Sequence, residues 1–76
     1  MDLKNNFASK ILYLRKTHQL SLSALGNAVG ISNQAISLLE QGKRSPSFEV
    51  LIALADYFDV SIDYLVGRSE EPKIHK

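Results

Sequence analysis

Two glycines four residues apart mark the segment 21–42, which reads SLSALGNAVGISNQAISLLEQG. A serine precedes each of its two apolar repeats, so we expect one helix over 22–29 and a second over 33–41. Two helices joined by so short a turn must cross steeply, and Gly26 supplies the small residue needed where their backbones approach. Gly30 tolerates the positive φ that the turn requires. The segment therefore predicts a helix-turn-helix.

The apolar residues around these glycines occupy the positions at which both helices must pack on one core. They are Leu25, Val29, Ile31, Ile36 and Leu39. Each has an ordinary explanation when taken alone, but the joint spacing of the glycines and apolar residues has few competing explanations. We therefore prefer a helix-turn-helix to generic helical packing.

Helical periodicity continues on both sides of the segment. A first helix is expected from Asn5 or Asn6, and a fourth from Ser47. Ser61 is expected to cap a fifth helix that runs through Val66. The apolar stripe of the first helix is Phe7, Ile11, Leu14 and His18, and that of the fourth is Leu51, Leu54, Ala55 and Phe58.

The length and composition fit one small all-α domain. A chain of 76 residues holds at most one core, and without cysteine its stability must come from helix packing. We expect a compact five-helix domain over residues 1–67, with the helix-turn-helix at about 22–41, and a flexible polar tail over 68–76. No apolar run or leader pattern predicts membrane insertion or secretion, so we expect a cytoplasmic protein.

The charges divide unevenly along the chain, although the net charge is only +1. Between residues 3 and 46, six lysines and arginines stand against Glu40 alone. Between residues 47 and 71, six acids stand against Arg68 alone. The first part is suited to attract a polyanion, although small proteins also show such asymmetry by chance.

These motifs together resemble the phage repressor and Cro family of helix-turn-helix regulators. The resemblance covers about residues 7–67 and implies a five-helix domain that acts as a dimer on a palindromic DNA operator, in bacteria or their phages. The function implied is transcriptional repression. The matching motifs are Leu20-Ser21, Leu25-Gly26, Val29-Gly30-Ile31-Ser32, Ile36-Ser37, Leu39-Glu40-Gln41-Gly42, Lys43-Arg44-Ser45-Pro46, Leu51, Leu54-Ala55 and Val60-Ser61-Ile62-Asp63-Tyr64-Leu65.

The resemblance makes residues 33–41 the recognition helix, with Asn33, Gln34 and Ser37 as base readers. Side-chain amides can pair with adenine through two hydrogen bonds, and a hydroxyl can donate or accept. Leu38 departs from the family, which commonly has a polar or basic residue there. It either touches a thymine methyl group or packs at the rim of the core.

Phosphate contacts are expected from residues beside the recognition helix and at helix starts. Leu22 stands where the family often has a phosphate-binding glutamine, so one such contact is in doubt. Gln41 fits either a phosphate contact or a solvated position. The other expected phosphate contacts are Ser21, Ser23, Ser32, Lys43 and Arg44, together with backbone N–H groups.

Glu40 would repel phosphate if its carboxylate were free, so it needs a partner. The family pattern pairs it with the arginine near the end of the first helix, here Arg15. A partly buried pair with two hydrogen bonds fits this chemistry. We expect both residues to serve structure and not DNA contact.

The alternatives are a protein-interaction module, such as an antitoxin, and, far less favoured, an enzyme. His18 and His75 are isolated, and neither a catalytic set, a metal site, a cofactor motif nor a small-molecule site is evident. The apolar residues Ile62, Tyr64 and Val66 are candidates for a homodimer interface, with closure of the core as the other explanation.

Overall fold

The computed structural model describes residues 2–72, and its elements over that range are all helices. The all-α, five-helix architecture expected from the sequence is confirmed. In chain order the elements are α1 (Leu3–Thr17), α2 (Leu22–Val29), α3 (Asn33–Glu40), α4 (Phe48–Phe58) and α5 (Ile62–Leu65).

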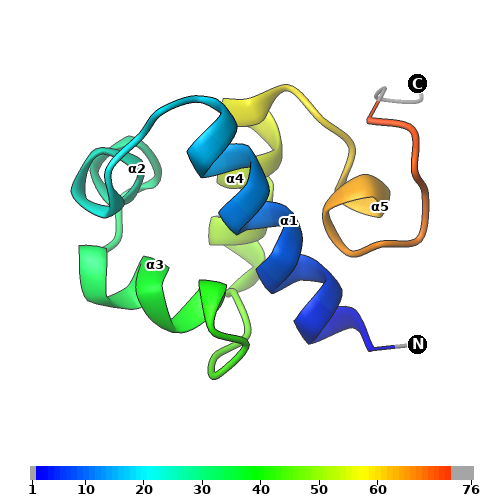
Figure 1. The fold of residues 1–76 in the computed structure, drawn as a ribbon, viewed down its shortest axis with the longest axis horizontal. Helices are drawn as coiled ribbons and strands as arrows, with labels where there is room; N and C mark the ends of the chain where they lie inside the picture. Colours follow the sequence, from blue (N-terminus) through cyan, green and yellow to red (C-terminus); the bar gives the residue numbers. More distant parts are fainter. Residues whose placement is uncertain (1, 73–76) are drawn as a thin grey trace.

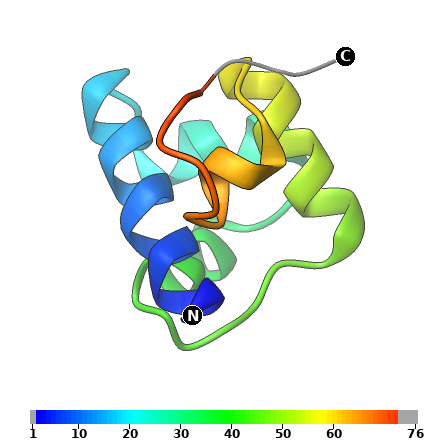
Figure 2. The same cartoon turned by 90° about the vertical axis from the view of Figure 1, so that its right-hand side faces the viewer.

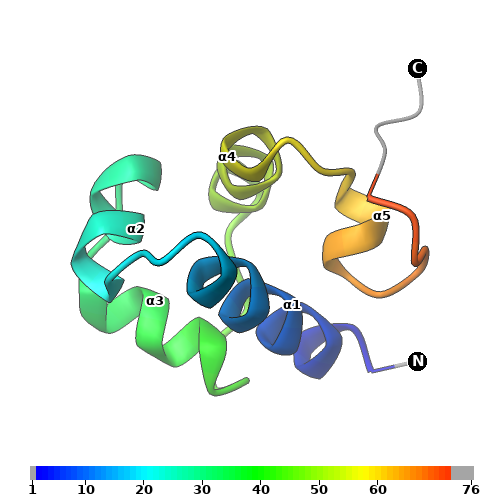
Figure 3. The same cartoon turned by 45° about the horizontal axis from the view of Figure 1, so that its top comes forward.

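The helix-turn-helix and α5 lie at opposite ends of the domain. Helices α2 and α3 pack against each other at one end, α5 lies at the other, and α1 and α4 lie between them (Figures 1 and 3). Figure 2 looks onto the α5 end, where the segment up to Pro72 runs beside α5. This C-terminal segment therefore lies away from the helix-turn-helix, whereas the start of α1 reaches the end of α3, where Asn5 lies beside Gly42.

One hydrophobic core connects all five helices. Its largest fully buried side chains are less than 2% exposed, and every helix contributes at least one. Phe7, Ile11 and Leu14 of α1 and the expected apolar face of α4 point into this core, with Leu51 at its edge. His18, expected on the stripe of the first helix, is exposed because α1 ends at Thr17 and His18 is its C-cap. The fully buried side chains are Phe7, Ile11, Leu25, Ile36, Leu39, Leu54 and Leu65.

Serine caps begin four of the helices, as the sequence predicts. Each serine oxygen accepts a hydrogen bond from the backbone N–H three residues later, which satisfies a donor that the helix itself cannot pair. The N···O distances are 2.9 Å at Ser21, 3.1 Å at Ser32, 3.2 Å at Ser47 and 3.0 Å at Ser61. These caps set where α2 to α5 begin.

The start of α1 differs from the expectation. Asp2, and neither Asn5 nor Asn6, is the cap: its Oδ1 accepts from the Asn5 backbone N–H at 3.2 Å. The Asn5 side chain donates back to Asp2 Oδ2 at 2.6 Å, so Asn5 supports the cap from inside the first turn. Helix α3 ends at Glu40 with Gln41 as its cap, and α5 ends at Leu65, one residue before Val66.

The segment after α5 turns back along that helix. The Ser61 N–H donates to the Pro72 carbonyl at 2.9 Å, and the Arg68 N–H donates to the Asp63 carbonyl at 2.8 Å. The tail expected over 68–76 is described only to Pro72, and its flexibility stays a prediction. His75 lies outside the described residues.

Candidate DNA-binding surface

The turn between α2 and α3 depends on its two glycines in different ways. A Cβ on Gly26 would lie 2.5 Å from the Ile31 carbonyl oxygen, so the backbones leave no space for a side chain there. The same Gly26 carbonyl accepts from the N–H groups of Gly30 and Ile31, at 2.8 and 2.9 Å. Gly30 adopts φ +83°, a conformation that L side chains rarely take. Together they hold α3 at a steep angle to α2.

Helix α3 divides into a buried and an exposed face. Ala35, Ile36 and Leu39 pack into the core. Asn33 and Gln34 are exposed, Ser37 is half-buried and Leu38 is 39% exposed. The four expected base-reading positions thus lie outside the core. Leu38 follows Gln34 by four residues, which places both on one side of the helix.

A row of polar side chains also runs along α3. Asn33, Ser37 and Gln41 are spaced by four residues and so lie above one another. Gln41 Nε2 donates to Ser37 Oγ at 2.8 Å. Asn33 Nδ2 donates to Ser23 Oγ of α2 at 3.3 Å. Neither contact was predicted from the sequence, although the four-residue spacing signals the first.

The expected phosphate-contacting residues border this face at helix ends. The Ser21 and Ser32 oxygens accept the capping hydrogen bonds, which leaves each O–H able to donate elsewhere. Gly42, at φ +72°, ends α3, and the following Lys43 N–H donates to the Leu38 carbonyl at 3.0 Å. This turn puts the exposed Lys43 and Arg44 directly after the recognition helix.

Arg15 and Glu40 join the end of α1 to the end of α3. Arg15 Nε and Nη2 donate to the two carboxylate oxygens of Glu40 at 2.5 and 3.0 Å, and Nη1 donates to the Leu20 carbonyl at 2.9 Å. The side chains are only 14% and 8% exposed. The hydrogen bonds to Glu40 raise the pKa of the Arg15 guanidinium, against the opposing effect of burial. The carboxylate therefore has a cationic partner within the fold.

Two of the three residues expected at a dimer interface lie on different sides of α5. Ile62 is 38% exposed and faces α4, whereas Tyr64 lies toward α1, with the Lys10 ammonium 4.4 Å from its ring centre. Val66, the C-cap of α5, is half-buried. Positions two apart on a helix point about 200° from each other, which explains the separation of Ile62 from Tyr64.

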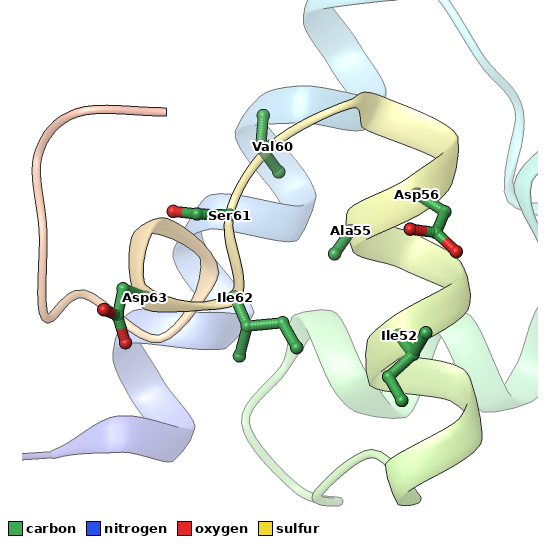
Figure 4. A pocket seen from close by; sticks show the side chains of 7 residues that line it. All are labelled: Ile52, Ala55, Asp56, Val60, Ser61, Ile62 and Asp63. Carbon is green, nitrogen blue, oxygen red and sulfur yellow. The ribbon is translucent and has the colours of Figure 1, made fainter. Parts of the chain in front are cut away.

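An apolar groove between α4 and α5 was not foreseen from the sequence. Ile52 and Ile62 point into it from the two helices, while Asp56 and Asp63 lie at its sides (Figure 4). Its volume is about 340 Å³. Phe48, one turn before Ile52 on α4, is 71% exposed. The spacing of Phe48 and Ile52 outside the buried stripe of α4 is the signal that could have revealed it.

Residues 2–72 contain neither a cluster of metal-ligating side chains nor a membrane-spanning helix. Within that range no three acidic or histidine side chains gather as a metal site would require. None of the helices described is long and apolar enough to cross a bilayer. The exposed face of α3 and the loop that follows it bring polar, apolar and basic side chains close together in the chain.

Comparisons with known proteins agree with this geometry. A family model described as Helix-turn-helix matches residues 11–65. The uncharacterized HTH-type transcriptional regulator YobD of Bacillus subtilis is 30% identical over 66 residues, which cover 87% of this chain and 59% of YobD. The HTH-type transcriptional regulator AnsR of the same organism is 37% identical over 62 residues, covering 82% of this chain and 53% of AnsR. The chain thus spans a little over half the length of these relatives.

One solved structure is similar to this fold over almost its whole length. It is the crystal structure of the P22 c2 repressor, a protein of Salmonella phage P22, in complex with a synthetic operator. It matches with a TM-score of 0.78 and 36% identity, covering 83% of this chain and 96% of that chain.

Proposed function

Since this chain belongs to the Cro/C1-type helix-turn-helix family, we propose that it is a sequence-specific DNA-binding regulator of transcription, acting as a repressor. The observation that carries the proposal is the outer face of α3, which presents two amides, a hydroxyl and a leucine while the inner face is buried. The operator-bound P22 c2 repressor, with the same fold, supports it. The proposal places the protein in the cytoplasm of a bacterium, with its operator on bacterial or phage DNA.

Sequence reading is assigned to the exposed face of α3. Asn33 and Gln34 can each pair with adenine through two hydrogen bonds, and each such pair discriminates by about 1–3 kcal/mol. Ser37 accepts from Gln41, so its O–H remains to donate to a base acceptor. Leu38 has the exposure needed to touch a thymine methyl group.

Phosphate binding is assigned to the groups that surround this face. Lys43 and Arg44 follow α3 directly, and Ser21, Ser23 and Ser32 lie at or near helix starts, where N–H groups and the helix dipole favour anions. Gln41 is tied to Ser37, which favours a supporting role for it over a phosphate contact. Such contacts fix position and affinity but carry little sequence information.

We also propose that the protein binds a palindromic operator as a homodimer through the α4–α5 groove. In this proposal Ile62 lies at the interface with Ile52 and Phe48, and Tyr64 and Val66, the other two residues expected from the sequence, are not assigned to the groove. A two-fold dimer would set the recognition helices about 34 Å apart on one face of the DNA. Analytical sedimentation of an Ile62→Asp variant tests this dimer interface. Tyr13→Asp, at an exposed position on α1, is the control. A monomer for Ile62→Asp alone supports the interface; an unchanged dimer refutes it.

The test of function is selection of binding sites from random duplex DNA, with an Asn33→Ala/Gln34→Ala variant in parallel. We expect the wild type to enrich a palindrome and the variant to lose the preference at specific positions. The absence of any enriched sequence would refute the proposal and favour a protein-interaction module such as an antitoxin.

A further inference from the structure

The hydrogen bond between Asn33 and Ser23 links the two helices of the helix-turn-helix at the surface assigned to DNA. The Asn33 amide nitrogen donates to the Ser23 hydroxyl oxygen at 3.3 Å, and both residues are exposed. Ser23 lies in the first turn of α2, and Asn33 is the first residue of α3. The capping hydrogen bonds of these helices use Ser21 and Ser32, so the Ser23 hydroxyl is not needed as a cap.

In the structure this contact places the nitrogen end of the Asn33 amide toward Ser23. A free asparagine amide can rotate by half a turn and offer either its oxygen or its nitrogen to a base. With the nitrogen held toward Ser23, the oxygen and the second N–H remain for the DNA. This arrangement matches adenine, which offers an amine donor and an N7 acceptor, whereas guanine offers two acceptors.

We propose that Ser23 is a positioning residue, which holds the Asn33 amide in the orientation that reads an exocyclic base amine, that of adenine above all. Fixing the amide before binding removes part of the entropy cost of ordering it on DNA. The Ser23 O–H is still free to donate to a phosphate, so the residue can bridge the backbone and the base reader. The inference rests on the proposed DNA-binding function and assigns Ser23 a role beyond a simple phosphate contact.

A double-mutant cycle separates the two roles of Ser23. The operator obtained by selection is measured with the wild type, Ser23→Ala, Asn33→Ala and the double variant. If Ser23 acts through Asn33, Ser23→Ala weakens operator binding by about 3- to 10-fold, equivalent to one hydrogen bond, but has little further effect once Asn33 is alanine. Ser23→Thr, which keeps the hydroxyl, should retain wild-type binding. Ser9→Ala, at an exposed serine on α1, is the matched control and should also bind normally.

Base analogues test the amine directly. The position read by Asn33 is the one whose preference Asn33→Ala loses, and we expect adenine there. Replacing that adenine by purine, which lacks the amine, should weaken wild type and Ser23→Thr but leave Asn33→Ala unchanged.

Three results would overturn the inference. One is a guanine preference at the Asn33 position. The second is that the losses of binding from Ser23→Ala and Asn33→Ala add in the cycle, and that Ser23→Ala weakens binding to operator and to random DNA equally. Ser23 would then be a phosphate contact only. The third is the absence of any selected site for the wild type, which alone would also remove the proposed function.

Discussion

Replacing Glu40 by alanine should lower the melting temperature strongly, because it leaves the guanidinium of Arg15 without its carboxylate. The pair is more than four-fifths buried on both sides and has two hydrogen bonds. Removing one partner of a buried pair costs about 3–5 kcal/mol, whereas exposed pairs contribute about 0.2–1 kcal/mol. Arg15 keeps its bond to the Leu20 carbonyl and some contact with water, so we expect a loss of about 2–3 kcal/mol.

For a domain of this size that loss corresponds to a melting temperature lower by roughly 10–20 °C, measured by circular dichroism. Arg68→Ala is the control, because Arg68 forms an exposed pair with Asp63 at 3.8 Å and should shift the midpoint only slightly. Arg15→Met/Glu40→Leu, which removes both charges, should recover much of the stability.

The pH dependence follows from the raised pKa of Arg15. A group with a raised pKa stabilises the fold below its unfolded pKa, and this contribution disappears as the pH rises through the folded pKa. For arginine the folded and the unfolded pKa both lie far above neutral pH. Arg15 therefore does not titrate between about pH 6 and about pH 8, and Glu40→Ala should lower the melting temperature equally at both. If the thermal midpoint of Glu40→Ala is no lower than that of Arg68→Ala, the stabilising role of the Arg15–Glu40 pair is refuted.

Four further substitutions test the turn, a strained residue and the phosphate contacts. Gly26→Ala should destabilise the fold by about 3 kcal/mol, because its Cβ would meet a backbone oxygen. Gly30→Ala has open space around its Cβ and strains only its φ angle, so it should cost about 1–2 kcal/mol. Thermal melts that give the reverse order would contradict this. Gln19→Gly should stabilise the fold by up to about 1 kcal/mol in urea unfolding, since Gln19 has φ +57°; a lower midpoint would refute it. Lys43→Ala should weaken binding to operator and to random DNA equally. It should also make the slope of log K against log salt concentration shallower by about 0.9. A loss of binding confined to the operator would argue for a base contact.

The helix-turn-helix could be predicted from sequence because its determinants are local. Ser21 and Ser32 cap within three residues, and Gly30 acts at its own φ angle. Gly26 is the informative exception, since its contact with Ile31 is tertiary yet is fixed by the short turn. The start of α1 could not be settled in this way, because Asp2 and Asn5 are both good caps and here they bond to each other.

Sequence spacing predicted which face of α3 is exposed, but not the contacts that its side chains make. Helical spacing placed Gln34 and Leu38 on one side of α3, yet the Asn33–Ser23 bond depends on the angle between two helices. The α4–α5 groove depends likewise on how α5 packs, and this packing separates Ile62 from Tyr64. Periodicity describes one helix at a time and carries no information on such pairs.

The structure assigns stability and the proposed recognition to different faces of α3. At its first turn the close contact at Gly26 sets the approach of α2, at its centre Ile36 is fully buried, and at its end Glu40 is held by Arg15. None of these anchors uses a base-reading side chain. Substitutions on the outer face should therefore stay within about 0.5 kcal/mol of the wild-type stability. Because the backbone of α3 stays fixed, a change in operator preference caused by such a substitution can be attributed to the side chain itself, which makes this face suitable for exchanging specificity.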